Sequence, residues 1–313
     1  MGEREYMRRT LLSLVSAGLL AIGMVAPVAA IRGDYRVDTE HPFVGLVAFY
    51  TDRQGTDAAF IHRCSGTLLN DGTPEDGSRV FLTAGHCTDD GSGTSVAVSA
   101  RVWFRQDAGT RYDGTRDPLS GYPHKCIDDK SVALDACMTS HEMYNYGFNN
   151  FAGFPNHKDV GIVILDKPVI LPSYGELSPL GTIDSLGNTG SATFTVSGYG
   201  ITTNTNTAAP ALSFRERLQA EATLVTTNST WTDGYNFATQ GSGSDRGGTC
   251  SGDSGGPVFY PGSANGFENE VVGVTSFGRT NPNDCVGLDW AYRVDRAEVL
   301  AWMDSVIGKN WSY

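Results

Sequence analysis

Three short segments carry side chains that together are suited to breaking an amide or ester bond. Ser254 lies in GDSGGP at 252–257, where flanking glycines let the backbone approach a substrate closely. A serine hydroxyl is a weak nucleophile unless a base takes its proton. His86, in TAGHC at 83–87, is suited to be that base, and Asp159, heading the apolar run at 159–165, is suited to bind the imidazole. These residues predict nucleophilic catalysis at Ser254.

The three segments occur in the order His, Asp, Ser and resemble those of the trypsin/chymotrypsin-like serine protease family. SGYG at 197–200 resembles the family's Gly-aromatic-Gly turn, and SFG at 276–278 resembles its Ser-aromatic-Gly segment that pairs with substrate backbone. The resemblance runs from about residue 31 to the C-terminal helix. It implies a secreted serine endopeptidase with two antiparallel six-stranded β-barrels and a site in the cleft between them.

The resemblance also implies a role for each residue. His86 accepts the proton of Ser254 and later donates it to the leaving amine, while Asp159 holds the imidazole in the right tautomer. The backbone N–H groups of Gly252 and Ser254 form the oxyanion hole. We expect a protein or peptide substrate, no cofactor and no metal. The remaining histidines are expected at the surface: His41, His62, His124, His141 and His157.

The choice of substrate is implied to depend on a pocket beside Ser254. Its expected residues are Gly248, Ser276, Phe277, Gly278, Asp289 and Trp290. An aspartate six residues before the nucleophile would select Arg or Lys, but Gly248 stands there, which favours an uncharged pocket. If Asp289 points inward, a basic preference returns; if Trp290 does, the pocket is small or blocked. The sequence leaves these alternatives open.

The family resemblance further implies an activation step. In the family a new N-terminus folds inward, and its α-amine pairs with the aspartate before the nucleophile, here Asp253. Ile31-Arg32-Gly33 is similar to such an N-terminus. The pairing would be a buried ion pair, whose loss is costly. Cleavage after Ala30 would make export and activation one event.

The first thirty residues have the pattern of a secretory signal peptide. Arg4, Arg8 and Arg9 precede an uncharged apolar run at 11–25, and small residues follow at 28–30. A membrane anchor is the alternative, but the run is short of the roughly 20 residues that a spanning helix needs. We therefore expect residues 1–30 to be removed, leaving a secreted protein with no membrane in its mature form.

Six cysteines, all after residue 30, suggest disulfides in an exported chain. A zinc site is not expected, because the chain has no C-x-x-C pair. The resemblance implies that Cys64 pairs with Cys87 and that Cys250 pairs with Cys285. Cys126 and Cys137 remain as the third pair, within a long stretch between His86 and Asp159 that either overhangs the cleft or decorates the surface.

The rest of the chain must position these residues, and it is typical of a β-rich protein. Short apolar runs are bounded by turn residues, at 43–50, 79–82, 96–104, 161–165, 192–197, 219–225, 257–260 and 270–276. This pattern alone fits either a sandwich or a pair of barrels. One helix is predicted near the C-terminus, where Asp295 and Glu298 form a capping box ahead of Val299, Trp302, Met303 and Val306.

Composition and chain length limit the remaining possibilities. The formal charge of −12 argues against a nucleic-acid partner, which needs a basic face. No linker divides the chain, so we expect one monomeric protease domain over 31–313, with barrel halves at roughly 31–170 and 171–313. A catalytically silent homologue that acts as a binding protein is the alternative function. An esterase of another fold would place its serine before its histidine.

Overall fold

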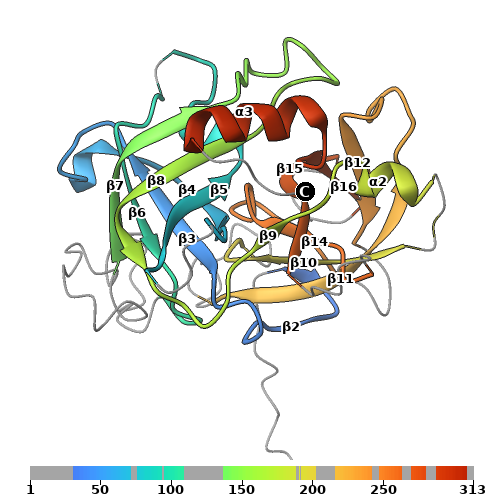
Figure 1. Ribbon diagram of the computed structural model, residues 1–313, viewed down its shortest axis with the longest axis horizontal. Coiled ribbons are helices and arrows are strands. Elements are labelled where there is room, and N and C mark those ends of the chain that lie inside the picture. The colour runs from blue at the N-terminus through green and yellow to red at the C-terminus, as the bar shows by residue number, and fades with distance from the viewer. Residues whose placement is uncertain are drawn as a thin grey trace, which may run out of the picture.

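Two antiparallel β-barrels form the molecule (Figure 1). The computed structural model describes residues 31–71, 76–93, 95–108, 137–187, 190, 192–201, 216–241, 247–262, 269–279 and 287–308. The first barrel closes in the order β3 (Val44–Tyr50), β4 (Phe60–Leu68), β5 (Ser78–Thr83), β8 (Gly161–Val169), β7 (Cys137–Asn145) and β6 (Ser99–Trp103). Its strands are rich in the β-branched and aromatic residues that pack well on a pleated surface.

The second barrel has the same number of strands. Its order is β10 (Thr193–Gly198), β14 (Pro257–Phe259), β15 (Glu270–Arg279), β16 (Leu288–Arg293), β12 (Asn236–Gln240) and β11 (Leu218–Thr226), and β11 pairs back with β10. The fold is therefore the predicted pair of six-stranded barrels, and the sandwich alternative is excluded.

The first described residues attach to the second barrel and not to the first. Strand β1 (Arg32–Gly33) pairs with β13 (Gly247–Gly248), and β2 (Tyr35–Val37) pairs with β11. The short β9 (Glu176–Leu177), between the barrels in sequence, pairs in parallel with β15. The chain thus ties its N-terminal segment to strands that come almost two hundred positions later.

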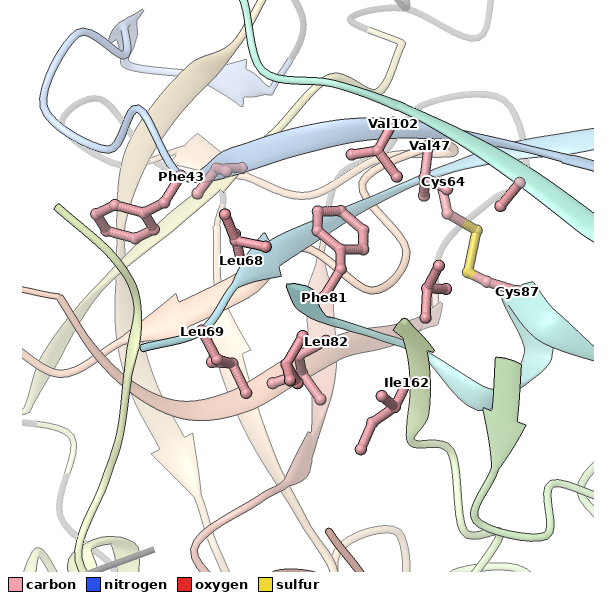
Figure 2. Close-up of a cluster of buried hydrophobic side chains, with 14 of the residues drawn as sticks. Phe43, Val47, Cys64, Leu68, Leu69, Phe81, Leu82, Cys87, Val102 and Ile162 are labelled. Carbon is pink, nitrogen blue, oxygen red and sulfur yellow. A yellow bond between two sulfur atoms is a disulfide. The ribbon is translucent and has the colours of Figure 1, made fainter. Parts of the chain in front are cut away.

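The interior of the first barrel is filled by large apolar side chains from facing strands. Val47, Phe81, Val102 and Ile162 are fully buried and converge in the cluster shown in Figure 2. The disulfide between Cys64 and Cys87 borders this cluster, with an S–S distance of 2.02 Å, which confirms that predicted pair. This packing fixes the base of the segment that carries His86.

The C-terminal helix is α3 (Ala297–Ile307), and its predicted cap is wrong. Arg296 occupies the N-cap without a side-chain bond, whereas the Asp295 carboxylate accepts the N–H of Ile183 in α2 (Thr182–Ser185) and two bonds from the Arg293 guanidinium. A buried guanidinium is a charged donor and outcompetes a helix N–H for the carboxylate. The predicted apolar stripe is correct, since Val299 and Met303 are buried.

Each predicted apolar run overlaps a strand, but the barrel strands β4, β7, β12 and β16 were not predicted, nor were the short strands β1, β2, β9 and β13. The other helices are the single turns η1 (Asp57–Ala59) and α1 (Gly85–Thr88). Among the described residues, no helix is both long and apolar enough to cross a bilayer.

The predictions for residues 1–30, His124, Cys126 and Cys285, and for the Cys137 side chain, lie outside the described parts. Cys250 is disulfide-bonded, but not to Cys64 or Cys87.

Candidate active site

His86 and Asp159 are joined by a pair of hydrogen bonds at the rim of the first barrel. His86 lies on the single turn α1, and Asp159 lies just before β8. The backbone N–H of His86 donates to Asp159 Oδ1 at 2.8 Å, and His86 Nδ1 lies 2.9 Å from Oδ2. Asp159 is fully buried, whereas the His86 side chain is 24% exposed. The pair therefore combines a buried carboxylate with an imidazole ring that is partly open to solvent.

The electrostatics of this pair follow from burial and mutual charge. Burial opposes the charged form of His86, but the Asp159 carboxylate outweighs it and raises the pKa of His86 above its usual 6.5. Burial likewise raises the pKa of Asp159, yet the charge and hydrogen bonds of His86, together with the Ser276 hydroxyl, bring it below its usual value. Asp159 is therefore ionised at neutral pH and stabilises a protonated His86.

Ser254 lies in a tight turn of the second barrel that contacts the residue after His86. Gly252 and Gly255 on either side have φ angles of 98° and 77°, which side-chain-bearing residues rarely adopt. The carbonyl oxygen of Ser254 lies 3.8 Å from Sγ of Cys87, the neighbour of His86. The Ser254 hydroxyl makes no hydrogen bond within the described parts, and such serine–histidine bonds are often long before substrate binds.

Two backbone donors in the Ser254 turn have no acceptor within the described parts of the chain. The N–H groups of Asp253, Gly255 and Gly256 each donate to a carbonyl in the protein. Those of Gly252 and Ser254 have no acceptor among the residues that the structure describes. Free, fixed donors beside a nucleophile are what an oxyanion hole requires.

Asp289 lies against the predicted pocket residues. Its Oδ2 accepts the N–H of Thr249 at 2.8 Å and would lie 2.7 Å from a Cβ placed on Gly248. Its Oδ1 would lie 3.3 Å from a Cβ placed on Gly278. Burial raises the pKa of Asp289 to about 7. The absence of side chains at Gly248 and Gly278 is what leaves room for this carboxylate.

Trp290 points to the other face of β16, as alternation along a strand requires. Its ring stacks on Phe277 with centroids 5.1 Å apart and planes 4° apart, and Trp231 lies 6.0 Å away. It is 3% exposed. Trp290 thus stacks on Phe277, on the face of β16 opposite to the one that carries the Asp289 side chain.

Ile31 and Asp253 are both fully buried. Ile31 packs in the core of the second barrel, and the next residue, Arg32, pairs with Gly248 in β13. The Asp253 carboxylate accepts the backbone N–H groups of Cys250 and Gly200, and burial raises its pKa to about 7. Within the described parts, no basic side chain pairs with it.

The sequence that forms these barrels and this site matches a known protein family. The Trypsin family profile matches residues 30–297. The chain belongs to the trypsin family. Comparison with curated proteins gives no significant match.

Solved structures agree with the trypsin-family fold. HL collagenase is 16% identical with a TM-score of 0.57, over 89% of this chain and 98% of that one. The thermostable serine protease AL20 from an extremophilic microorganism is 15% identical with a TM-score of 0.54, over 86% and 99%. The scabies mite inactivated protease paralogue S-D1 is 16% identical with a TM-score of 0.52, over 90% and 98%. The fold therefore occurs both in proteases and in a protein described as inactivated.

Two histidines expected at the surface are buried, so that part of the prediction is wrong. His157 has no exposed surface, and its Nε2 lies 2.9 Å from the Ser276 hydroxyl, which in turn donates to Asp159. His41 is 5% exposed and is bonded to Asp38. Ser276 was predicted in the pocket, but its hydroxyl binds Asp159. No spacing in the sequence links His157 or Asp159 to Ser276, because these bonds join segments more than a hundred residues apart.

Three described residues near His86 have donor atoms close enough together to suggest a metal site, but they do not form one. Cys64, Cys87 and His86 offer donor atoms within 4.8 Å of one another. Both sulfurs belong to the disulfide, however, so they are not thiolate ligands.

Proposed function

We propose that this trypsin-family chain is a secreted serine endopeptidase with Ser254, His86 and Asp159 as its catalytic triad. The observation that carries the proposal is the buried Asp159 carboxylate bonded to Nδ1 of a part-exposed His86. This arrangement supports the tautomer of His86 in which Nε2 is a base.

The proposed reaction follows the serine-protease template. His86 takes the proton of Ser254 as the hydroxyl attacks the substrate carbonyl, and the resulting oxyanion is bound by the free N–H groups of Gly252 and Ser254. His86 then donates its proton to the departing amine, leaving an acyl-enzyme that water hydrolyses by the same steps. Asp159, ionised and buried, stabilises the imidazolium formed in between.

For substrate choice, we propose a basic preference at the pocket beside Ser254. The position of Asp289 favours this alternative over the uncharged pocket that Gly248 suggested from sequence. Trp290, packed behind Phe277, is proposed to brace the pocket wall and not to block it. Cleavage of a peptide library should then select Arg and Lys, and Asp289→Asn should remove that selection. An unchanged profile in the variant would rule out this role.

Activation is proposed to require cleavage after Ala30, which would give Ile31 a free α-amine. Ile31 is buried next to the strand that precedes the Asp253 turn, and Asp253 is a buried carboxylate with a raised pKa. No cation pairs with this carboxylate among the described residues, and an ammonium group would compensate its buried charge. N-terminal sequencing of active enzyme from the culture medium should begin at Ile31; a different start, or retention in the cell, would contradict this.

A catalytically silent binding protein is the second candidate, because one structural neighbour is described as an inactivated protease paralogue. The presence of both the paired His86–Asp159 and the free N–H groups favours catalysis. The deciding experiment is reaction with a phosphonate that labels active serines. We expect one label per chain, on Ser254, and loss of label and peptidase activity in Ser254→Ala. Full activity of that variant, or no reaction of the wild type, would overturn the proposed function.

A further inference from the structure

Ser65, a residue of the first barrel, is bound to the turn of the second barrel that carries Ser254. It lies in β4 and is fully buried. Its backbone N–H donates to the carbonyl of Ser254 at 2.9 Å, and its own carbonyl accepts the Thr83 hydroxyl at 2.9 Å. The backbone of Ser65 is therefore fixed on both sides before its side chain is considered.

The Ser65 hydroxyl makes two further bonds across the barrel interface. It accepts the N–H of Tyr199 at 2.9 Å and donates to the carbonyl of Gly252 at 2.9 Å. A backbone N–H only donates and a carbonyl only accepts, so the direction of both bonds is fixed. One side chain thus connects the segment after β10 to the residue that offers an oxyanion-hole donor.

The glycines of the surrounding motifs make this contact possible. A Cβ on Gly198 would lie 3.0 Å from Ser65 Oγ, and a Cβ on Gly255 would lie 2.6 Å from the Ser65 carbonyl oxygen. Side chains there would push the two barrels apart. Part of the glycine content of SGYG and GDSGGP is therefore explained by the approach of Ser65.

Gly252 needs an external restraint. Its φ of 98° is open to glycine, and glycine has no side chain to oppose rotation of the two peptide groups beside it. Within the described parts of the chain, the Ser65 hydroxyl is the only donor to its carbonyl. Rotation of Gly252 would move both its carbonyl and the N–H proposed to bind the oxyanion.

We propose that Ser65 is a positioning residue of the oxyanion hole: its hydroxyl holds Gly252 in the orientation that presents its N–H to the substrate. This inference rests on the proposed peptidase function. It assigns a catalytic consequence to a residue that contacts neither the substrate nor the triad side chains.

The test compares Ser65→Ala with Ser140→Ala. Ser140 is also fully buried in the first barrel and its hydroxyl donates to a backbone carbonyl, that of Ile164 at 2.7 Å. Rates are expressed per site titrated by the phosphonate, so misfolded protein does not count. We expect Ser65→Ala to lower kcat about tenfold with KM nearly unchanged, less than the roughly 10²–10³ lost with an oxyanion donor itself. Ser140→Ala should leave kcat unchanged.

A second measurement separates positioning from general loosening. A peptidyl boronic acid forms a tetrahedral adduct with Ser254 whose oxygen occupies the oxyanion hole. Its affinity should fall about tenfold in Ser65→Ala and not in Ser140→Ala. Ser65→Ala with kcat and boronate affinity within twofold of wild type would overturn the inference while leaving the proposed function intact. Wild-type protein inert to substrate and phosphonate would instead overturn the proposed function.

Discussion

Two buried carboxylates in this molecule have nearly the same partners. Asp38 is bonded to Nδ1 of His41 at 3.0 Å and to the hydroxyl of Ser197. Asp159 is bonded to Nδ1 of His86 at 2.9 Å and to the hydroxyl of Ser276. Each carboxylate therefore holds one histidine and one serine from separate segments of the chain.

The two networks differ in what else they contain and in what they expose. His41 is 7% exposed in its side chain and stacks on Phe259 with centroids 4.5 Å apart, and Arg217 lies 3.7 Å from Asp38. The His86 side chain is 24% exposed, and among the described residues no guanidinium forms an ion pair with Asp159. A carboxylate, a histidine and a serine are thus not enough to define a catalytic site. The exposed fraction of the histidine side chain, 24% for His86 against 7% for His41, is what separates the two networks.

The largest effect should come from Asp159→Asn. The amide no longer holds the His86 tautomer or stabilises its imidazolium, and kcat should fall about 10⁴-fold, as in the serine-protease template. Steady-state kinetics on phosphonate-titrated enzyme measures this, and urea unfolding checks that the variant is folded. Activity within tenfold of wild type would show that the Asp159 network is structural, like the Asp38 network.

Asp38→Asn should lower the stability of the protein strongly and leave kcat nearly unchanged. Arg217 is buried and also donates to the carbonyls of Val44 and Phe104, so removal of the carboxylate leaves its charge uncompensated. The free energy of unfolding should fall by about 3–5 kcal/mol. We expect kcat per titrated site to stay within twofold. A large fall in kcat at normal stability would mean that the Asp38 network acts on catalysis directly.

Acidification should inactivate the enzyme before it unfolds. The pKa of His86 is raised above 6.5, so His86 becomes protonated, and useless as a base, as pH falls through that raised value. Burial raises the pKa of Asp38, but His41, Arg217 and Ser197 lower it to about 2. The ionised Asp38 carboxylate therefore adds about 2 kcal/mol to the free energy of unfolding. This contribution is fully present above the unfolded pKa of 3.8 and is lost as the pH falls from there through 2.

Profiles of kcat/KM and of circular dichroism over the same pH range check this separation. They should show a reversible, folded but inactive form between the two transitions. Coincident loss of activity and structure would contradict it.

The smallest effects should come from the two serines that serve the carboxylates. Ser276→Ala should lower kcat by about three- to tenfold, because Asp159 keeps both bonds to His86. Ser197→Ala should leave kcat unchanged and lower the free energy of unfolding by about 1–2 kcal/mol. Kinetics and urea unfolding on both variants give the comparison. Equal effects of both substitutions on kcat would contradict a catalytic role for the Asp159 network and a structural role for the Asp38 network.

The parts of the site that the sequence predicted are those encoded in short contiguous segments. GDSGGP and TAGHC identify Ser254 and His86, and Asp159 follows from chain order and the apolar strand behind it. The apolar runs that became strands were identified for the same reason. The strands β4, β7, β12 and β16 were missed because polar residues interrupt them, such as His62 and Arg63 in β4.

The parts that could not be predicted depend on pairings between distant segments. Asp295 looked like a helix cap, yet the buried Arg293 takes its carboxylate. His157 and His41 looked like surface residues, yet His157 is bonded to Ser276 and His41 stacks on Phe259, both far away in the sequence. The orientation of Asp289 depends on the register between β15 and β16, where a bulge shifts the alternation. Local patterns carry no information about such contacts.

The pairing of β2 with β11 has a consequence for how the protein is made. The N-terminal segment emerges from the ribosome first but has no strand to join until residues 218–220 follow. At the other end, α3 packs its Trp302 against Tyr146 beside the first barrel, with ring centroids 5.1 Å apart. Strand β2 thus completes the sheet of the second barrel, and helix α3 packs beside the first barrel. Neither half should fold as a separate fragment, and the native structure should form only after residues up to Trp302 have been synthesised.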